Sequence, residues 1–234
     1  MSLRNKQRRR IRSKGIAIFY SEMIKFLGGA GAYLYLRPKI HRISENAPKS
    51  MKGGVLIAAN HTSTLDPVAL FCVFWRRRLY FPATEELFEK PMNRFFFKNM
   101  NCIRIDRRES NAKAVRTMCE LLQDGRAVAI FPEGRINAEE ADIDLKRGTA
   151  FMALRCGCPI LPVYISHRES KGQRLHIVVG EPIYGDRVCE GLPRAERVDV
   201  LSAHLKSKAA EFEDYYREIC KRETHGAVGS RTGK

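Results

Sequence analysis

The sequence lacks any uninterrupted apolar run of the roughly 20 residues that a membrane-spanning helix requires. It is also poor in acidic residues, with 26 Asp and Glu against 42 Lys and Arg, which gives a formal net charge of +16. This excess of positive charge indicates an anionic partner, such as a nucleic acid or a membrane surface. The length of 234 residues and the hydrophobic content of 44% predict one domain with a sizeable core and exclude a disordered chain.

The cysteines show no pattern typical of a metal site. Cys156 and Cys158 are separated by one residue, and no second Cys or His pair accompanies them. The seven cysteines are odd in number and lie in apolar segments, which favours reduced, buried thiols in a domain that faces the cytosol. We therefore predict that all seven serve packing and that the protein holds no metal ion.

Signatures of two competing function classes are missing. No Gly-x-Ser-x-Gly sequence occurs, so the chain lacks the nucleophile turn of the α/β hydrolases. His61 and Ser63 are also too close on one loop for a conventional base and nucleophile. No zinc-finger, helix-turn-helix or aromatic RNA-binding pattern is present, which disfavours nucleic acid as the anionic partner.

The basic residues concentrate at the amino terminus. Seven of them and no acidic residue lie between Met1 and Lys14, and the most apolar stretch of the chain follows at 16–36, interrupted by Glu22 and Lys25. This pattern favours short amphipathic helices whose apolar face enters a bilayer while the basic arm attracts anionic headgroups. Residues 1–36 are thus predicted to be an interfacial anchor at the cytoplasmic face of a membrane; the alternative is a helix that packs on the protein's own core.

The rest of the chain alternates between β-prone and helical segments. Residues 37–52 read as a linker because Pro38 and Pro48 flank a polar stretch. Residues 53–220 predict an α/β domain with a mostly parallel central sheet flanked by helices, closed by an amphipathic helix after Leu192. Residues 221–234 are expected to be a frayed tail. The predicted strands are 55–59, 78–81, 102–105, 126–131, 160–165 and 174–179, and helices are expected after Asp66, around 91–98, at 110–123 and at 146–155.

A histidine and a carboxylate follow the first predicted strand of this domain. His61 lies just beyond 55–59, and Asp66 is expected to cap the next helix, with Pro67 at the first helical position. Ligands of α/β sheets collect beyond the carboxyl ends of strands. If Asp66 folds back onto His61, it fixes one imidazole tautomer and leaves the other nitrogen able to take a proton from a hydroxyl.

A second polar cluster follows the predicted strand 126–131. It comprises Glu133, Gly134 and Arg135, and it should lie near His61 because the carboxyl ends of parallel strands meet at one edge of a sheet. A guanidinium can hold a phosphate through two parallel hydrogen bonds.

These segments resemble, in order, four sequence blocks of the glycerolipid acyltransferases, the family typified by 1-acylglycerol-3-phosphate acyltransferase. The resemblance extends over about residues 53–185. The matching blocks are Asn60-His61-x4-Asp66, Ile105-Asp106-Arg107, Phe131-Pro132-Glu133-Gly134, and Pro159-Ile160-Leu161-Pro162-Val163.

The resemblance implies an O-acyltransferase of phospholipid biosynthesis that needs no metal or other cofactor. His61, oriented by Asp66, would deprotonate the hydroxyl of a lysolipid as that oxygen attacks the thioester of acyl-CoA or acyl carrier protein. The expected acceptor is 1-acylglycerol 3-phosphate, and the product phosphatidate. By the same resemblance, Arg107 and Arg135 would hold the acceptor's phosphate, and Glu133 and Gly134 would shape its site.

The identity of the acceptor stays open because the sequence departs from the family at three positions. Thr84 stands where many relatives have a lysine, Asn101 replaces a common glycine, and Arg135 follows Gly134 directly. Another lysolipid acceptor is therefore an alternative. A catalytically silent lipid-binding protein on the same fold is a second one.

Overall fold

The computed structural model describes residues 31, 33–49, 51–89, 101–105, 112–132, 143–168, 170 and 173–229. The first 30 residues of the expected anchor lie outside these ranges, as does the expected helix around 91–98.

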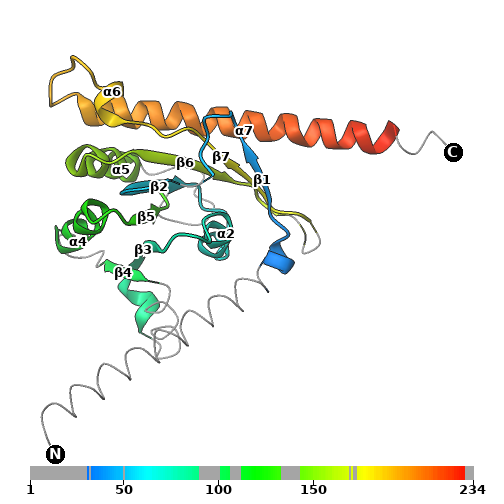
Figure 1. Ribbon diagram of the computed structural model, residues 1–234, viewed down its shortest axis with the longest axis horizontal. Coiled ribbons are helices and arrows are strands. Elements are labelled where there is room, and N and C mark those ends of the chain that lie inside the picture. Colours follow the sequence, from blue (N-terminus) through cyan, green and yellow to red (C-terminus); the bar gives the residue numbers. More distant parts are fainter. Residues whose placement is uncertain are drawn as a thin grey trace, which may run out of the picture.

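Seven strands form one mostly parallel sheet in the order β1-β7-β6-β2-β5-β3-β4 (Figure 1). All neighbouring strands run parallel except β6 and β7, which are antiparallel. The predicted α/β class with a mostly parallel sheet is confirmed. The strands are β1 (Lys39–Arg42), β2 (Val55–Ala59), β3 (Leu79–Thr84), β4 (Cys102–Ile105), β5 (Ala127–Ile130), β6 (Ile160–Ile165) and β7 (His176–Val179).

The central strands are apolar along their whole length because both of their faces are covered. In β2, Val55 and Ile57 enter one core and Leu56 enters the other, and all three side chains are buried. Continuous apolar runs of this kind are typical of parallel strands between two helical layers. The middle of the sheet is thus a rigid support for whatever follows the carboxyl ends of β2, β5 and β6.

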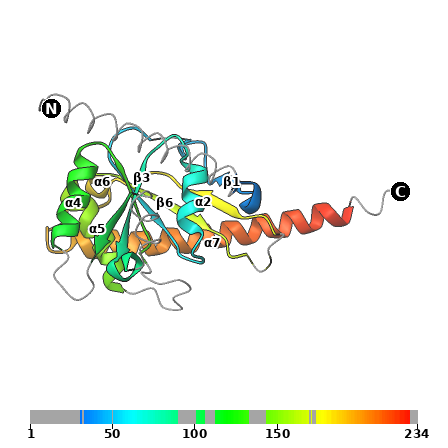
Figure 2. The ribbon, with the colours of Figure 1, turned by 90° about the horizontal axis from the view of Figure 1, so that it is seen from below.

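Helices cover both faces of the sheet (Figures 1 and 2). Helix α2 (Asp66–Val73) packs on one face. Helices α4 (Ala112–Gln123), α5 (Ile143–Cys156) and α7 (Arg197–Gly229) pack on the other, together with the short α6 (Gly185–Val188). The predicted end of α4 is confirmed, because Gly125 has a φ of +75°, the left-handed conformation in which glycine terminates helices. A 3₁₀ turn, η1 (Glu85–Phe88), follows β3.

Two boundaries differ from the sequence-based expectation. The range 37–52 is not merely a linker, because it contributes β1, which pairs in parallel with β7. Helix α7 continues to Gly229, through most of the range expected to be a frayed tail. Ion pairs one helical turn apart, Arg217 with Glu213 and Arg222 with Glu218, stabilise this projecting part of α7 (Figure 1).

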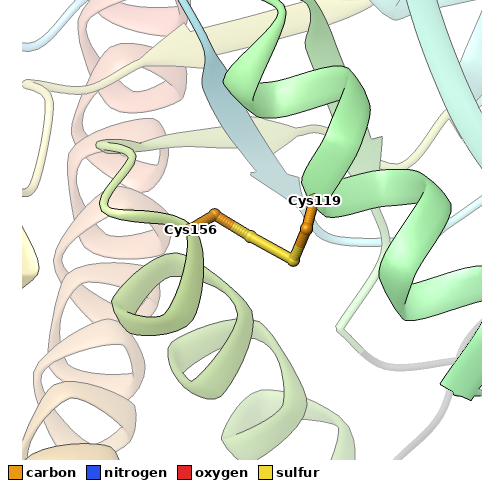
Figure 3. The surroundings of a disulfide bond; sticks show 2 residues. All are labelled: Cys119 and Cys156. Atoms are coloured by element: carbon orange, nitrogen blue, oxygen red, sulfur yellow. A yellow bond between two sulfur atoms is a disulfide. The ribbon is translucent and has the colours of Figure 1, made fainter.

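One pair of cysteines is bonded rather than free. Cys119 of α4 and Cys156, the last residue of α5, form a disulfide with their Cα atoms 5.6 Å apart (Figure 3). The prediction that all seven cysteines are free thiols is wrong for this pair, because only the packing of α4 beside α5 brings the two together. The other five are in no disulfide, and burial raises the pKa of Cys102 to about 12 and that of Cys158 to about 11.

Reducing this disulfide should lower the free energy of unfolding by about 4 kcal/mol, because the bond joins residues 37 positions apart and so removes loop-closure entropy from the unfolded chain. Urea unfolding with and without a reductant measures the change. In a Cys119→Ser variant the reductant should have no further effect. Equal unfolding midpoints of the unaltered protein under both conditions would contradict the expectation.

Two stacked histidines lie near the β1 edge of the sheet. The rings of His41 on β1 and His176 on β7 are 5.2 Å apart with planes 12° apart, and Glu223 of α7 approaches His176 Nε2 at 3.8 Å. Lys39 pairs with Glu223. Burial lowers the pKa of both histidines from the ordinary value, and for His41 the charge of His176 lowers it further.

Stability should therefore decrease as the pH falls below about 6.5, where histidines of the unfolded chain take up protons that the folded pair resists. Above that pH both states hold neutral imidazoles, and the pair contributes no pH dependence. Urea unfolding at pH 7.5 and pH 5.5 tests this. A His41→Phe variant should show a smaller loss on acidification. His204→Gln, several turns before Glu223 on α7, should leave the loss unchanged, and an undiminished loss in His41→Phe would contradict the prediction.

Candidate active site

The proposed base lies directly beyond the carboxyl end of β2, in the middle of the sheet. His61 is the second residue after that strand, whose neighbours are β5 and β6. Its side chain is 17% exposed, so the imidazole is partly sheltered and still open to solvent. The predicted location at the strand-end edge of an α/β sheet is confirmed.

His61 and Asp66 meet as the sequence predicted. His61 donates from Nδ1 to Asp66 Oδ2 over 2.8 Å, and the Asp66 side chain is 2% exposed. The same carboxylate oxygen accepts the backbone N–H groups of Thr62 at 2.6 Å and Ser63 at 2.7 Å, and the Thr62 hydroxyl lies 3.4 Å from Oδ1. These donors fix the carboxylate at the centre of the loop, so it can fix the imidazole in turn.

The helix boundary at this loop differs by one residue from the prediction. Asp66 is the first residue of α2 rather than its cap, Leu65 occupies the cap position, and Pro67 is second. The reason is that the Asp66 carboxylate turns back to the amides of Thr62 and Ser63 instead of capping the amides of α2. This reversal brings the carboxylate to His61.

The Nδ1 hydrogen bond determines the tautomer of the imidazole. A carboxylate accepts and does not donate, so Nδ1 of His61 carries the hydrogen, and in the neutral ring Nε2 has the lone pair. A lone pair on Nε2 is what a general base needs for a substrate hydroxyl. The geometry therefore fits proton abstraction by Nε2, with Asp66 compensating the positive charge that the ring acquires.

Asn60 joins the start of the loop to the neighbouring strand. Its Nδ2 donates to the carbonyl oxygen of Ile165 over 2.8 Å, and its Oδ1 accepts the Ile165 N–H at 2.6 Å. The amide thus continues the pairing of β2 with β6 through a side chain. Sequence reasoning included Asn60 in a motif and gave it no role, because its partner is 105 residues away.

Phe131 packs on the base and was not predicted to do so. It follows β5 immediately, and its ring lies 4.3 Å from the His61 ring, with the two planes 17° apart. Its position directly after a strand that neighbours β2 is the signal that sequence reasoning could have used. The site therefore includes an aromatic face as well as a carboxylate.

The four predicted acceptor residues lie outside the described residues, and their roles stay predictions. They are Arg107, Glu133, Gly134 and Arg135. The strand order nevertheless shows how far the strands that precede these residues lie from β2. β5, which precedes Glu133, is the direct neighbour of β2, whereas β4, which precedes Arg107, lies two strands further from β2 than β5 does.

Within the described ranges, no three His, Cys, Asp or Glu side chains gather in a way that could hold a metal ion. No described helix is both long and apolar enough to cross a membrane.

Comparisons with known proteins identify the family of the chain. A model of the acyltransferase family matches residues 39–166, more than half of the chain. The chain is 27% identical over 175 residues to a 1-acyl-sn-glycerol-3-phosphate acyltransferase of Bacillus subtilis, covering 73% of this chain and 85% of that protein. It is 30% identical over 169 residues to the protein of the same name from Neisseria meningitidis, covering 70% and 64%.

The fold also matches a crystal structure of the 1-acyl-sn-glycerophosphate (LPA) acyltransferase PlsC from Thermotoga maritima. The TM-score is 0.60 at 23% identity, covering 86% of this chain and 83% of that one. The family match includes β2, β5 and β6 together with Asn60, His61, Phe131 and Ile165. The chain therefore belongs to the acyltransferase family, in the branch of glycerolipid acyltransferases.

Proposed function

We propose that this protein transfers a fatty acyl group from a thioester to the free hydroxyl of 1-acylglycerol 3-phosphate and so forms phosphatidate. The observation that carries the proposal is the 2.8 Å contact between His61 Nδ1 and Asp66 Oδ2 at the carboxyl edge of the sheet. The names of the Bacillus and Neisseria relatives support the choice of acceptor.

The reaction needs one base and no covalent enzyme intermediate. His61 Nε2 takes the proton of the acceptor hydroxyl as its oxygen attacks the thioester carbonyl carbon. An ester bond forms, the carbon–sulfur bond breaks, and the departing thiolate takes the proton back from the imidazolium. Asp66 stabilises the imidazolium in between. General base catalysis of this kind contributes about 10²- to 10⁴-fold, and holding the two substrates together supplies further acceleration.

In this proposal the acceptor's phosphate is held by arginines. Arg107 and Arg135 are assigned to it, with Glu133 and Gly134 shaping the acceptor site. Thr84, the last residue of β3, supplies no charge, so the phosphate depends on the arginines. The donor is acyl-CoA or acyl carrier protein, both of which are anionic and suit a chain with a net charge of +16.

We further propose that residues 1–36 hold the enzyme at the cytoplasmic face of a membrane, where acceptor and product reside. The described end of this segment supports the idea. Tyr33, Leu34 and Tyr35 are 52%, 76% and 48% exposed, whereas Leu36 is buried in the core. Exposed Tyr and Leu side chains are typical of an interfacial segment.

A donor and acceptor matrix tests the proposed reaction. The full-length protein is given acyl-CoA or acyl carrier protein together with glycerol 3-phosphate, lysophosphatidate or a zwitterionic lysolipid. We expect labelled phosphatidate from lysophosphatidate, and no free fatty acid when the acceptor is omitted. Preferred transfer to another lysolipid would overturn the acceptor, stoichiometric hydrolysis would overturn the transferase, and binding without product would indicate a silent lipid-binding protein.

Sedimentation with vesicles tests the anchor separately. The full chain should sediment with vesicles that contain anionic lipid, and a chain that begins at residue 37 should remain largely in the supernatant. Equal sedimentation of the two chains would contradict the anchor without affecting the proposed reaction.

A further inference from the structure

We propose that Phe131 is a positioning residue that sets the plane of the His61 imidazole and stabilises the positive charge the ring acquires with a proton. The kinetic part of this inference rests on the proposed function, because it takes His61 as the base. The structural part rests on the ring contact alone, in which the centroids are 4.3 Å apart and the planes differ by 17°.

The hydrogen bond to Asp66 is not sufficient to aim the base. The hydrogen bond from Nδ1 to Oδ2 fixes where the ring is tethered, but by itself it does not set the tilt of the imidazole about that axis. Tilting moves Nε2, which lies on the opposite side of the ring, away from a bound hydroxyl. A flat surface against the ring removes this freedom, and the face of Phe131 is such a surface.

Phe131 is itself held by a row of aromatic rings. Its ring lies 6.3 Å from that of Phe81 with planes 16° apart, and Phe81 is buried on β3. Phe71 of α2 contacts Phe81 at 5.3 Å, but its ring is tilted by 60° and lies outside this parallel stack. The stack of Phe131 on Phe81 therefore connects the plane of the imidazole to a strand of the core.

The strand register brings Phe131 to the base. Ala58 of β2 is opposite Ile130 of β5, so Phe131 leaves the sheet next to the segment that begins the His61 loop. Both rings emerge at the same edge from adjacent parallel strands. Their contact is consequently fixed by backbone pairing, which gives the position of Phe131 the precision that a catalytic base requires.

The aromatic face also favours the protonated form of the base. A benzene ring has a negative face, which attracts a cation more strongly than a neutral imidazole. When His61 takes the proton of the acceptor, the stack becomes a cation–π contact.

The test compares side chains that keep the aromatic face with side chains that remove it. Phe131→Leu and Phe131→Met fill the space without a π system, whereas Phe131→Tyr and Phe131→Trp retain one. The matched control is Phe71→Leu, since Phe71 contacts Phe81 outside the parallel stack and is separated from His61 by two rings. Thermal unfolding of each full-length variant identifies those that fold. If one variant of a class does not fold, the other variant of that class is used in its place.

Three readouts separate positioning from mere packing. We expect Phe131→Leu and Phe131→Met to lower kcat about 10-fold with unchanged KM for both substrates, and to move the acid limb of the pH profile to lower pH. NMR of ¹⁵N-histidine-labelled protein, with the His61 signal assigned by its loss in H61Q, should show the same displacement of the titration midpoint. Phe131→Tyr, Phe131→Trp and Phe71→Leu should resemble the unaltered protein.

The NMR titration needs neither acceptor nor donor, so it tests the stack even if the proposed reaction is wrong. An unmoved His61 midpoint in both aliphatic variants would overturn the proposal. Loss of kcat in the aromatic variants equal to that in the aliphatic ones would overturn it as well, because shape alone would then account for the effect.

Discussion

Replacing His61 by alanine should lower kcat for acyl transfer by about 10²- to 10⁴-fold, because the substitution removes the group that takes the hydroxyl proton. The fold should survive, since the side chain lies on a loop, is 17% exposed and is not part of the buried apolar cores. Single-turnover transfer of a radiolabelled acyl group measures the effect, and circular dichroism with thermal unfolding checks the fold.

A second histidine provides the control for this experiment. His167 is exposed just beyond the carboxyl end of β6, the other neighbour of β2. His167→Ala should keep its kcat within a few-fold of the unaltered protein. Activity of His61→Ala within threefold of the unaltered protein would remove the imidazole from the mechanism.

Asp66→Asn should reduce kcat by a similar factor, about 10²- to 10⁴-fold, while leaving the KM for the thioester nearly unchanged. Asparagine has the size of aspartate, and its amide oxygen, placed where Oδ2 lies, can still accept from the backbone of Thr62 and Ser63 and from His61 Nδ1. The amide carries no negative charge, so it cannot stabilise the imidazolium that forms when Nε2 takes the proton of the acceptor.

The pH dependence and a control variant distinguish this effect from general damage to the loop. Raising the pH should not restore Asp66→Asn, because the defect is the missing negative charge beside the imidazolium rather than a lack of neutral imidazole. Thr62→Val removes only the 3.4 Å hydroxyl contact and should retain most of the activity. A kcat for Asp66→Asn within tenfold of the unaltered protein would contradict the role of the carboxylate.

The local pattern of apolar and polar residues along the sequence predicted much of the fold. The strands β2, β4 and β6 have the predicted ends, because each is a short apolar run bounded by polar residues, glycine or proline. The strand β1 was missed because its four residues, Lys-Ile-His-Arg, carry little apolar signal. Its place in the sheet depends on β7, which lies more than 130 residues later in the chain. The Cys119–Cys156 disulfide depends in the same way on the packing of two helices.

The same distinction applies to the site. His61 and Asp66 are five residues apart on one loop, so their contact is local and could be predicted from spacing. The contact of Phe131 with His61 requires the register of β2 against β5, and that of Asn60 with Ile165 requires the register of β2 against β6. Neither register is visible in the sequence, even though all of these positions except Ile165 lie in the recognised blocks.

The paired hydrogen bonds of Asn60 explain how the proposed base can lie on a loop and still be held in place. A side-chain amide here replaces a peptide group, so the main chain turns away from the sheet while the ladder of hydrogen bonds is extended by one more rung. The start of the loop is consequently attached to two strands, to β2 through the main chain and to β6 through the Asn60 side chain. His61, the next residue, therefore moves with the strands rather than with the exposed part of the loop. Fluctuations of the nearby surface consequently displace its imidazole less.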